Sequence, residues 1–201
     1  MKDLRCIETI RIEHNIAHNI RYHQTRFDKT RKELWGAKEP IELSREIDAP
    51  TEALYKCRIT YGEKIERIEY LPYVKKLPQS FVLVESELDY SYKFADRSAI
   101  EALKVQGEQK EIIITKKGYL TDTSIANIAF LNGKEWFTPK KALLRGTMRA
   151  KLLDGGLIKE KDIKIEDLEK YTNFALINAM LGFEIINRAK IEREAQCLKI
   201  F

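Results

Sequence analysis

The chain has 201 residues, a formal net charge of +5 and a sequence pI of about 8.9; 44% of its residues are hydrophobic and 33% are charged. This length suits one sizeable domain or two small lobes. No apolar run approaches the roughly 20 residues that a membrane helix needs, so a membrane protein is not expected. Basic and acidic residues are interspersed, which favours attraction of a small anionic molecule over nucleic-acid binding.

The cysteines and the first residues bear on the cellular compartment. Cys6, Cys57 and Cys197 are scattered and odd in number, and they form no CxxC pair and no Cys/His spacing typical of a metal site. The sequence starts without the apolar core of a signal peptide. We therefore expect reduced thiols, no bound metal and a cytoplasmic location.

The first part of the chain predicts a small antiparallel sheet with one long helix. Residues 6–12 alternate as a strand, with Glu8 on the otherwise apolar side, which predicts that one end of the strand faces a cleft. Asn15 is a candidate start of the helix, and Gly36 a candidate end. The remaining predicted segments are a loop over 37–52, strands over 54–60 and 65–73 joined by a turn at 61–64, and a buried strand over 81–84.

The second part predicts further strands with short helices. The predicted helices cover 99–105, 147–153 and 165–171. The predicted strands cover 111–115, a stretch from 120, 125–131, 136–139, 173–180 and parts of 183–201. With no repeat and no long linker, the expected division is a small lobe over 1–88 and a larger, sheet-rich lobe over 89–201.

Lys93 is the first candidate for chemistry. It follows the buried strand over 81–84 and lies between Tyr92 and Phe94. Partial desolvation favours the neutral amine, which is a nucleophile that can form a Schiff base with an aldehyde. The alternative is an ordinary surface lysine with its ammonium group in water.

Four separated motifs occur in an informative order. They are His23-Gln-Thr-Arg26, Tyr92-Lys93 with Asp96-Arg97, Thr121-Asp-Thr-Ser-Ile-Ala-Asn127 and Leu143-Leu-Arg-Gly-Thr-Met-Arg149. In this order and spacing the set resembles the class IV pyridoxal-phosphate enzymes, which include branched-chain aminotransferases, D-amino acid aminotransferases and 4-amino-4-deoxychorismate lyases. The resemblance covers nearly the whole chain. It implies an α+β, two-lobed fold of the fold-type IV class, pyridoxal 5'-phosphate as cofactor, and a homodimer.

The resemblance also implies roles for particular residues. Lys93 matches the Schiff-base and proton-transfer lysine, and Arg26 matches a phosphate ligand, although a solvated helix arginine is the alternative. Asp122 falls at the acidic position beside the pyridine nitrogen, where the family usually has glutamate; the alternative is a turn residue. The further cofactor-binding residues that it implies are Gly146, Thr147, Met148, Asn178 and Ala179. Met148 stands where the family often has threonine.

The branch of the family is indicated by fewer residues. Asp96-Arg97 matches the asparagine-arginine of many aminodeoxychorismate lyases, and Thr9 matches a threonine that faces the cofactor, so Thr9 is a second catalytic candidate. Arg97 and Arg11 are candidate ligands of substrate carboxylates, unless Arg97 pairs with Asp96 or Glu101. The predicted function is a lyase that gives 4-aminobenzoate and pyruvate, as in folate biosynthesis. The alternatives are a branched-chain or D-amino acid aminotransferase and a non-catalytic cofactor-binding relative.

Overall fold

The computed structural model describes residues 4–48, 53–104, 110–193 and 196–201, and the chain forms two compact units. The first unit contains residues 1–75 and 92–96, and the second contains 76–91 and 97–201. This division differs from a single boundary between residues 88 and 89. Residues 92–96 belong to the first unit because the main chain of Lys93 accepts a hydrogen bond from Ile7 N–H at 2.8 Å, beside a bridge between Cys6 and Phe94.

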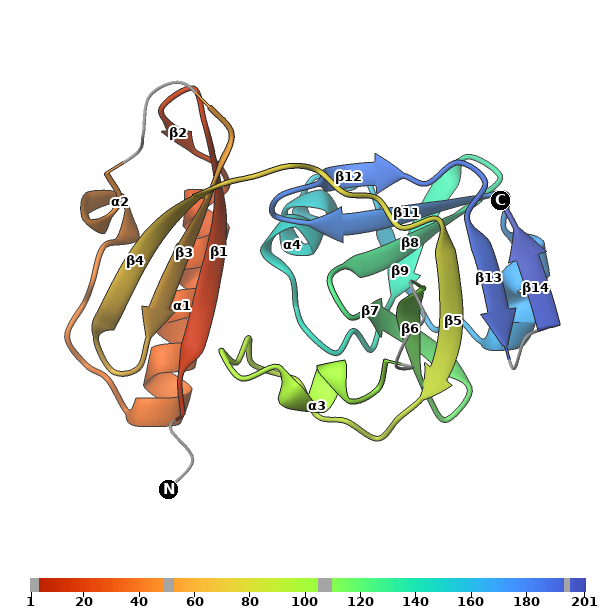
Figure 1. Ribbon diagram of the computed structural model, residues 1–201, viewed down its shortest axis with the longest axis horizontal. Helices are drawn as coiled ribbons and strands as arrows, with labels where there is room; N and C mark the ends of the chain where they lie inside the picture. Colours follow the sequence, from red (N-terminus) through yellow and green to blue (C-terminus); the bar gives the residue numbers. More distant parts are fainter. Residues whose placement is uncertain (1–3, 49–52, 105–109, 194–195) are drawn as a thin grey trace. The chain divides into compact units, whose positions relative to one another are not determined.

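The described residues of the first unit form a four-stranded antiparallel sheet with two helices. Figure 1 labels these elements. The strand order is β2-β1-β3-β4. The strands are β1 (Cys6–Glu13), β2 (Ile16–Ala17), β3 (Tyr55–Tyr61) and β4 (Ile65–Pro72), and the helices are α1 (Ile20–Trp35) and α2 (Leu43–Glu46). The small antiparallel sheet with one long helix is therefore confirmed, and α2 is an additional turn of helix inside the predicted loop over 37–52.

The core of the first unit lies between the sheet and α1. Alternate residues of β1 face it, and Ile10 and Ile12 are fully buried together with Phe27 of α1 and Ile59 of β3. Glu8 belongs to the same face and is also fully buried. The prediction that this end of β1 faces a cleft is therefore wrong, because α1 covers Glu8.

The start of α1 differs from the prediction and its end agrees with it. Asn15 has φ 63° and lies in the tight turn between β1 and β2, not at the helix start. The helix begins at Ile20, after Asn19 with φ 57°. Gly36 ends it with φ 65°, a conformation that glycine adopts without strain.

The second unit is built on a ten-stranded sheet among the described residues. Its main path runs β10-β9-β8-β7-β6-β5-β13-β14, and β11 pairs with β8 and β12. The strands are β5 (Ser80–Glu85), β6 (Glu111–Lys116), β7 (Tyr119–Thr123), β8 (Asn127–Asn132), β9 (Glu135–Pro139), β10 (Lys159–Lys161), β11 (Asn173–Asn178), β12 (Gly182–Ile185), β13 (Lys190–Arg193) and β14 (Gln196–Ile200). The buried strand predicted over 81–84 is β5, which pairs in parallel with β6 and β13 and so belongs to this unit.

In the described part of this unit, three short helical segments accompany the sheet. They are α3 (Ser98–Glu101), α4 (Thr147–Asp154) and the 3₁₀ helix η1 (Ile165–Lys170). Figure 1 shows α4 beside β11, and the two elements pack together through a small apolar cluster that includes Leu152 and Ile177. No helix within the described ranges is both long and apolar enough to cross a membrane.

Candidate active site

The main chain around Lys93 is fixed to the start of β1. Besides the bond from Ile7 N–H to Lys93 O at 2.8 Å, Ala95 N–H donates to Arg5 O at 2.8 Å. The rings of Tyr92 and Phe94 meet edge to face with their centroids 5.9 Å apart, and Lys93 between them is half-buried. Lys93 therefore has a defined position in the first unit.

A buried charged cluster lies on the β1 and α1 elements of the same unit. Arg26 donates from Nε to Oε1 of Glu8 at 2.8 Å and from Nη2 to Oε2 at 2.6 Å, which is a bidentate pair. His23 Nδ1 lies 2.6 Å from Oε2 of the same carboxylate. Arg26 and His23 are three residues apart on α1, so they lie on one face of the helix and reach Glu8 together.

The protonation states of this cluster follow from burial and charge. Burial alone would raise the pKa of Glu8, but Arg26 and His23 lower it to about 2. Burial also lowers the pKa of His23, and the positive charges of Arg26 and Lys93 lower it further. The Glu8 carboxylate acts in the opposite direction and raises this pKa. His23 is therefore neutral near pH 7, and its Nδ1 carries the proton, because a carboxylate can only accept.

The other predicted residues of β1 have different surroundings. Thr9 and Arg11 lie on the opposite face of β1 from Glu8, because successive side chains of a strand alternate. Thr9 is half-buried and lies opposite Arg58 of β3. Arg11 donates from Nε and Nη2 to Oε2 of Glu13, at 3.2 and 2.7 Å.

In the second unit, Asp122 is the centre of a second polar arrangement. Its side chain is buried at the end of β7. Asn127 Nδ2 donates to Oδ1 at 2.7 Å, and Leu144 N–H donates to Oδ2 at 2.9 Å. Burial raises the pKa of Asp122 to about 6, although these two bonds oppose the shift. The carboxylate is thus fixed through both oxygens and is the weakest acid among the aspartates whose pKa shifts are resolved.

Gly146 lies close to this arrangement and starts α4. A Cβ added to Gly146 would lie 2.1 Å from Oδ1 of Asn127, so no larger residue fits without a shift. The first helical residues are Thr147, which is buried, and Met148, which is half-buried. No side chain caps this helix start, and the first turn carries no acidic residue. Such a helix start favours an anion.

Two further predicted residues hold the turn between β7 and β8. Arg97 Nη2 donates to Ser124 O at 2.8 Å and to Glu101 Oε1 at 3.2 Å, so the expected ion pair with Glu101 is present. Asn178 Nδ2 donates to Ile125 O at 3.2 Å, and its Oδ1 accepts bonds from the next turn of the chain. Ala179 follows in that turn and is half-buried. Arg97, Asn178 and Gly146 therefore all contact residues 122–127, the segment that contains Asp122.

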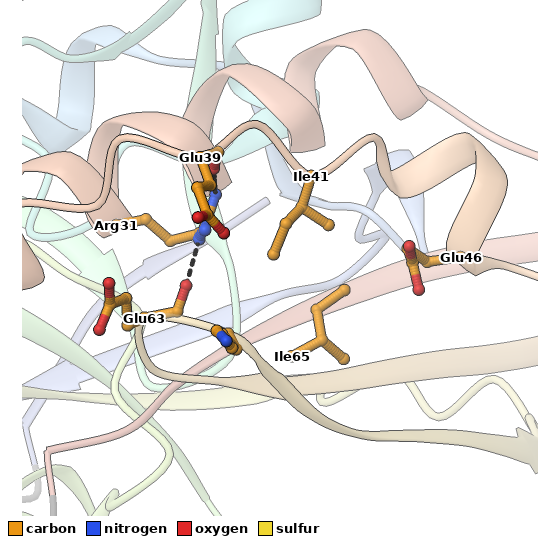
Figure 2. Close-up of a pocket in the computed structure, with 7 residues that line it drawn as sticks. Arg31, Glu39, Ile41, Glu46, Glu63 and Ile65 are labelled. Carbon is orange, nitrogen blue, oxygen red and sulfur yellow. Dashed lines mark hydrogen bonds between the residues drawn. The ribbon is translucent and has the colours of Figure 1, made fainter.

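A separate pocket of about 240 Å³ lies in the first unit, as Figure 2 shows. Arg31 extends along it and donates from Nε to Glu63 O at 2.7 Å and from Nη1 to Glu39 O at 3.1 Å. These bonds join the segment after α1 to the β3–β4 turn. Its lining residues are Arg31, Glu39, Ile41, Glu46, Glu63, Lys64 and Ile65, none of which is a predicted site residue.

Sequence reasoning placed Arg26 but missed its partner Glu8. The available signal was a carboxylate at an apolar position of an alternating strand, together with a histidine and an arginine three residues apart on the following helix. A buried carboxylate needs such partners, because an unpaired charge in the core is very costly. Among the described residues, no group of three or more His, Cys, Asp or Glu side chains could hold a metal ion.

The family described as amino-transferase class IV matches residues 91–188. A Haemophilus influenzae protein of unassigned function is 39% identical over 182 residues, which are 87% of this chain and 97% of that protein. The crystal structure of a proposed 4-amino-4-deoxychorismate lyase from Haemophilus somnus is 38% identical with a TM-score of 0.83, covering 90% of this chain and 99% of that one. A proposed aminodeoxychorismate lyase from Schizosaccharomyces pombe is 32% identical over 106 residues, which are 49% of this chain and 46% of that protein.

These likenesses extend over nearly the full length of the bacterial relatives, and they confirm the α+β fold-type IV prediction. The span matched by the family, residues 91–188, contains Lys93, Asp122 and Gly146. The chain therefore belongs to the class IV aminotransferase family of pyridoxal-phosphate-dependent enzymes, in its aminodeoxychorismate lyase-like branch.

Proposed function

We propose that this protein is a pyridoxal-phosphate-dependent 4-amino-4-deoxychorismate lyase that releases 4-aminobenzoate and pyruvate. The observation that carries the proposal is the end-to-end likeness, at 38% identity, to the Haemophilus somnus protein named for that reaction. The product would serve folate synthesis in the cytoplasm. A homodimer is part of the proposal, and the molar mass in solution, by light scattering, tests it against the 23.5 kDa chain.

The residues present fit this cofactor. Asp122 is a buried carboxylate that accepts bonds from Asn127 and Leu144, with a further backbone contribution from Leu143. A carboxylate has about four acceptor sites, so it can accept one more bond from a ring N–H. The start of α4 after Gly146 offers backbone N–H groups and no acid to a phosphate. Arg26 uses Nε and Nη2 on Glu8 and keeps Nη1 for a further anion contact.

When bound, pyridoxal phosphate supplies an electron sink for the carbon that carries the substrate amine. The protein would supply the base, the charge and the orientation. Lys93 would remove the proton from the ring carbon that bears the nitrogen, and the electron pair of that C–H bond would form a ring double bond as the C–O bond on the neighbouring ring carbon breaks. The enolpyruvate that leaves would take up a proton at its methylene carbon and become pyruvate. The remaining ring becomes aromatic, which drives the reaction. Asp122 would hold positive charge at the ring nitrogen, and Gly146, Thr147 and Met148 would hold the phosphate. Arg26 is a further proposed phosphate ligand, which the resemblance to the family implies.

The role of Lys93 is tested by trapping the cofactor on the protein with borohydride and locating it by mass spectrometry. The Lys93→Arg variant keeps a cation at this position but cannot form the Schiff base with the cofactor aldehyde. We therefore expect it to retain no cofactor after reduction. Lys38→Ala, at an exposed lysine of the same unit, is the matched control and should label as the wild type does. Equal labelling of Lys93→Arg would show that another lysine carries the cofactor.

The reaction is tested with the wild-type holoenzyme and three kinds of substrate. Pyruvate and 4-aminobenzoate formed in equal amounts from aminodeoxychorismate would support the lyase. Release of a keto acid from branched-chain L-amino acids or D-alanine, with an acceptor keto acid present, would make it an aminotransferase. Cofactor binding without turnover of any of them would favour the non-catalytic alternative.

A further inference from the structure

We propose that Asn127 is a positioning residue that ties the carboxylate of Asp122 to the segment leading into α4. The side chain of Asn127 would then fix the position of the Asp122 carboxylate relative to the start of α4. The functional meaning of this link rests on the proposed cofactor site. The link itself concerns only residues of the second unit and can be tested without any cofactor.

The contacts form a closed three-membered arrangement. Asn127 Nδ2 donates to Asp122 Oδ1 at 2.7 Å and to Leu144 O at 2.8 Å. Leu144 N–H in turn donates to Asp122 Oδ2 at 2.9 Å. Each pair among the three residues is thus hydrogen-bonded, and the two hydrogens of one amide nitrogen are both used. The amide of Asn127 thus joins Asp122, five positions before it, to Leu144, 17 positions after it.

Gly146 gives an independent sign that the position of Asn127 matters. The space that a Cβ on Gly146 would need is taken by Oδ1 of Asn127, only 2.1 Å away. The main chain just before α4 is therefore packed directly against the amide. Its φ of -66° is open to any residue, so the requirement for glycine here comes from this close approach and not from backbone conformation.

Other side chains would not make the same link. An aspartate at position 127 would place a second carboxylate against Asp122, and a leucine of similar size would offer no donor to either Asp122 or Leu144 O. Asn127 is itself buried, so water cannot readily take over both bonds. The amide is thus suited to fix a charged carboxylate in one orientation.

The link is tested first in the wild-type protein without cofactor. NMR titration of the labelled Asp122 carboxyl gives its pKa, with Asp122→Asn used for assignment. The side-chain N–H signals of Asn127 should shift with the same midpoint, because they are bonded to the group that titrates. If the Asn127 signals do not shift at that midpoint, the proposal is overturned. This test uses the wild-type protein and so does not depend on whether any variant folds.

Two variants then test whether Asn127 positions the Asp122 carboxylate or only stabilises the fold. Asn127→Leu removes the donor, and Gly146→Ala displaces the amide without changing it. In both we expect the pKa of Asp122 to rise, since a bond to its charged form is lost, and the dissociation constant of pyridoxal phosphate to increase about tenfold, the effect of a lost bond of ~1.4 kcal/mol. Asn132→Ala, at the other end of β8, is the matched control and should change neither value.

The two readouts distinguish the failure of this proposal from the failure of the proposed function. An unchanged pKa of Asp122 in Asn127→Leu or Gly146→Ala would overturn the positioning role. A raised pKa in a protein whose wild type does not bind pyridoxal phosphate would support the link and contradict the cofactor site. Weaker cofactor binding with an unchanged pKa would assign the loss to the helix start alone and count against Asn127.

Discussion

Arg26 and Glu8 form a bidentate ion pair in the core of the first unit, with Nε–Oε1 and Nη2–Oε2 distances of 2.8 and 2.6 Å. The Glu8 side chain is fully buried and the Arg26 side chain is 15% exposed. The pair joins β1 to α1 within the same unit that holds Lys93. The guanidinium group of Arg26, which we propose as a ligand of the cofactor's phosphate, is therefore held in place by the Glu8 carboxylate.

Replacing Glu8 by glutamine should destabilise the protein strongly. The change leaves Arg26 buried without a counter-charge, and breaking one partner of a buried pair costs about 3–5 kcal/mol. Urea unfolding at neutral pH measures the loss. Glu42→Gln is the matched control, because Glu42 pairs with Arg45 on the surface and such pairs contribute about 0–1 kcal/mol. A loss for Glu8→Gln no greater than that of Glu42→Gln would contradict the buried pair.

The raised pKa of Asp122 predicts that the stability of the protein changes with pH in mildly acidic solution. Its pKa is about 6 in the folded protein and is normally 3.8, so the folded state binds more protons between these values. The free energy of unfolding contributed by Asp122 is therefore greatest below pH 3.8 and falls as the pH rises through 6, by about 3 kcal/mol. Asp122→Asn should lack this decrease when urea unfolding is followed from pH 4 to 7. Parallel pH curves for the variant and the wild type would show that Asp122 ionises normally.

Glu8 has the opposite effect on the pH dependence of stability: its contribution is lost in acid, not gained. Its pKa is lowered to about 2 from 4.5, so the stability that it contributes is present above pH 4.5 and is lost as the pH falls towards 2. The pH range of 4.5 to 7 therefore isolates Asp122 from Glu8.

Much of the first unit could be predicted from the sequence because its signals are local. The alternation of β1, the turn at 61–64 and Gly36 at the end of α1 each depend on neighbouring residues. The start of α1 could not, because Asn15 favours a tight turn as well as a helix cap, and pairing with β2 decides between them. Glu8 was missed as a site residue because its partners come from a different element. The pairing of β5 with β6 and β13 depends on contacts far along the chain.

The site residues show the same division between local and distant information. The motifs located Asp122 and Gly146, but they did not reveal that Asn127 contacts both. Arg97 was expected to bind substrate or to pair with an acid. The structure shows the pair with Glu101 and adds a bond to the main chain of Ser124, which no sequence pattern indicates.

Arg97→Met should therefore weaken the cofactor site more than it weakens substrate binding. The bond to Ser124 O holds the turn that follows Asp122, and losing it should raise the dissociation constant of pyridoxal phosphate by about threefold to tenfold, or ~0.7–1.4 kcal/mol. The KM for aminodeoxychorismate, measured at saturating cofactor, should stay within about twofold. Arg45→Met, at an exposed arginine, serves as the control. A large rise in KM with unchanged cofactor affinity would instead assign Arg97 to the substrate carboxylate.

Met148→Thr should strengthen phosphate binding at the start of α4. Met148 is the second residue of that helix, and a hydroxyl there adds a donor beside backbone N–H groups that already favour an anion. We expect the dissociation constant of pyridoxal phosphate to fall by about threefold to tenfold. Met148 also packs against the apolar cluster of Leu152 and Ile158, so stability should fall by about 1–2 kcal/mol. Pyridoxal, which lacks the phosphate, is the matched ligand: its affinity should not change. An equal gain for both ligands would place the effect away from the phosphate, and no gain for either would show that the helix start does not bind it.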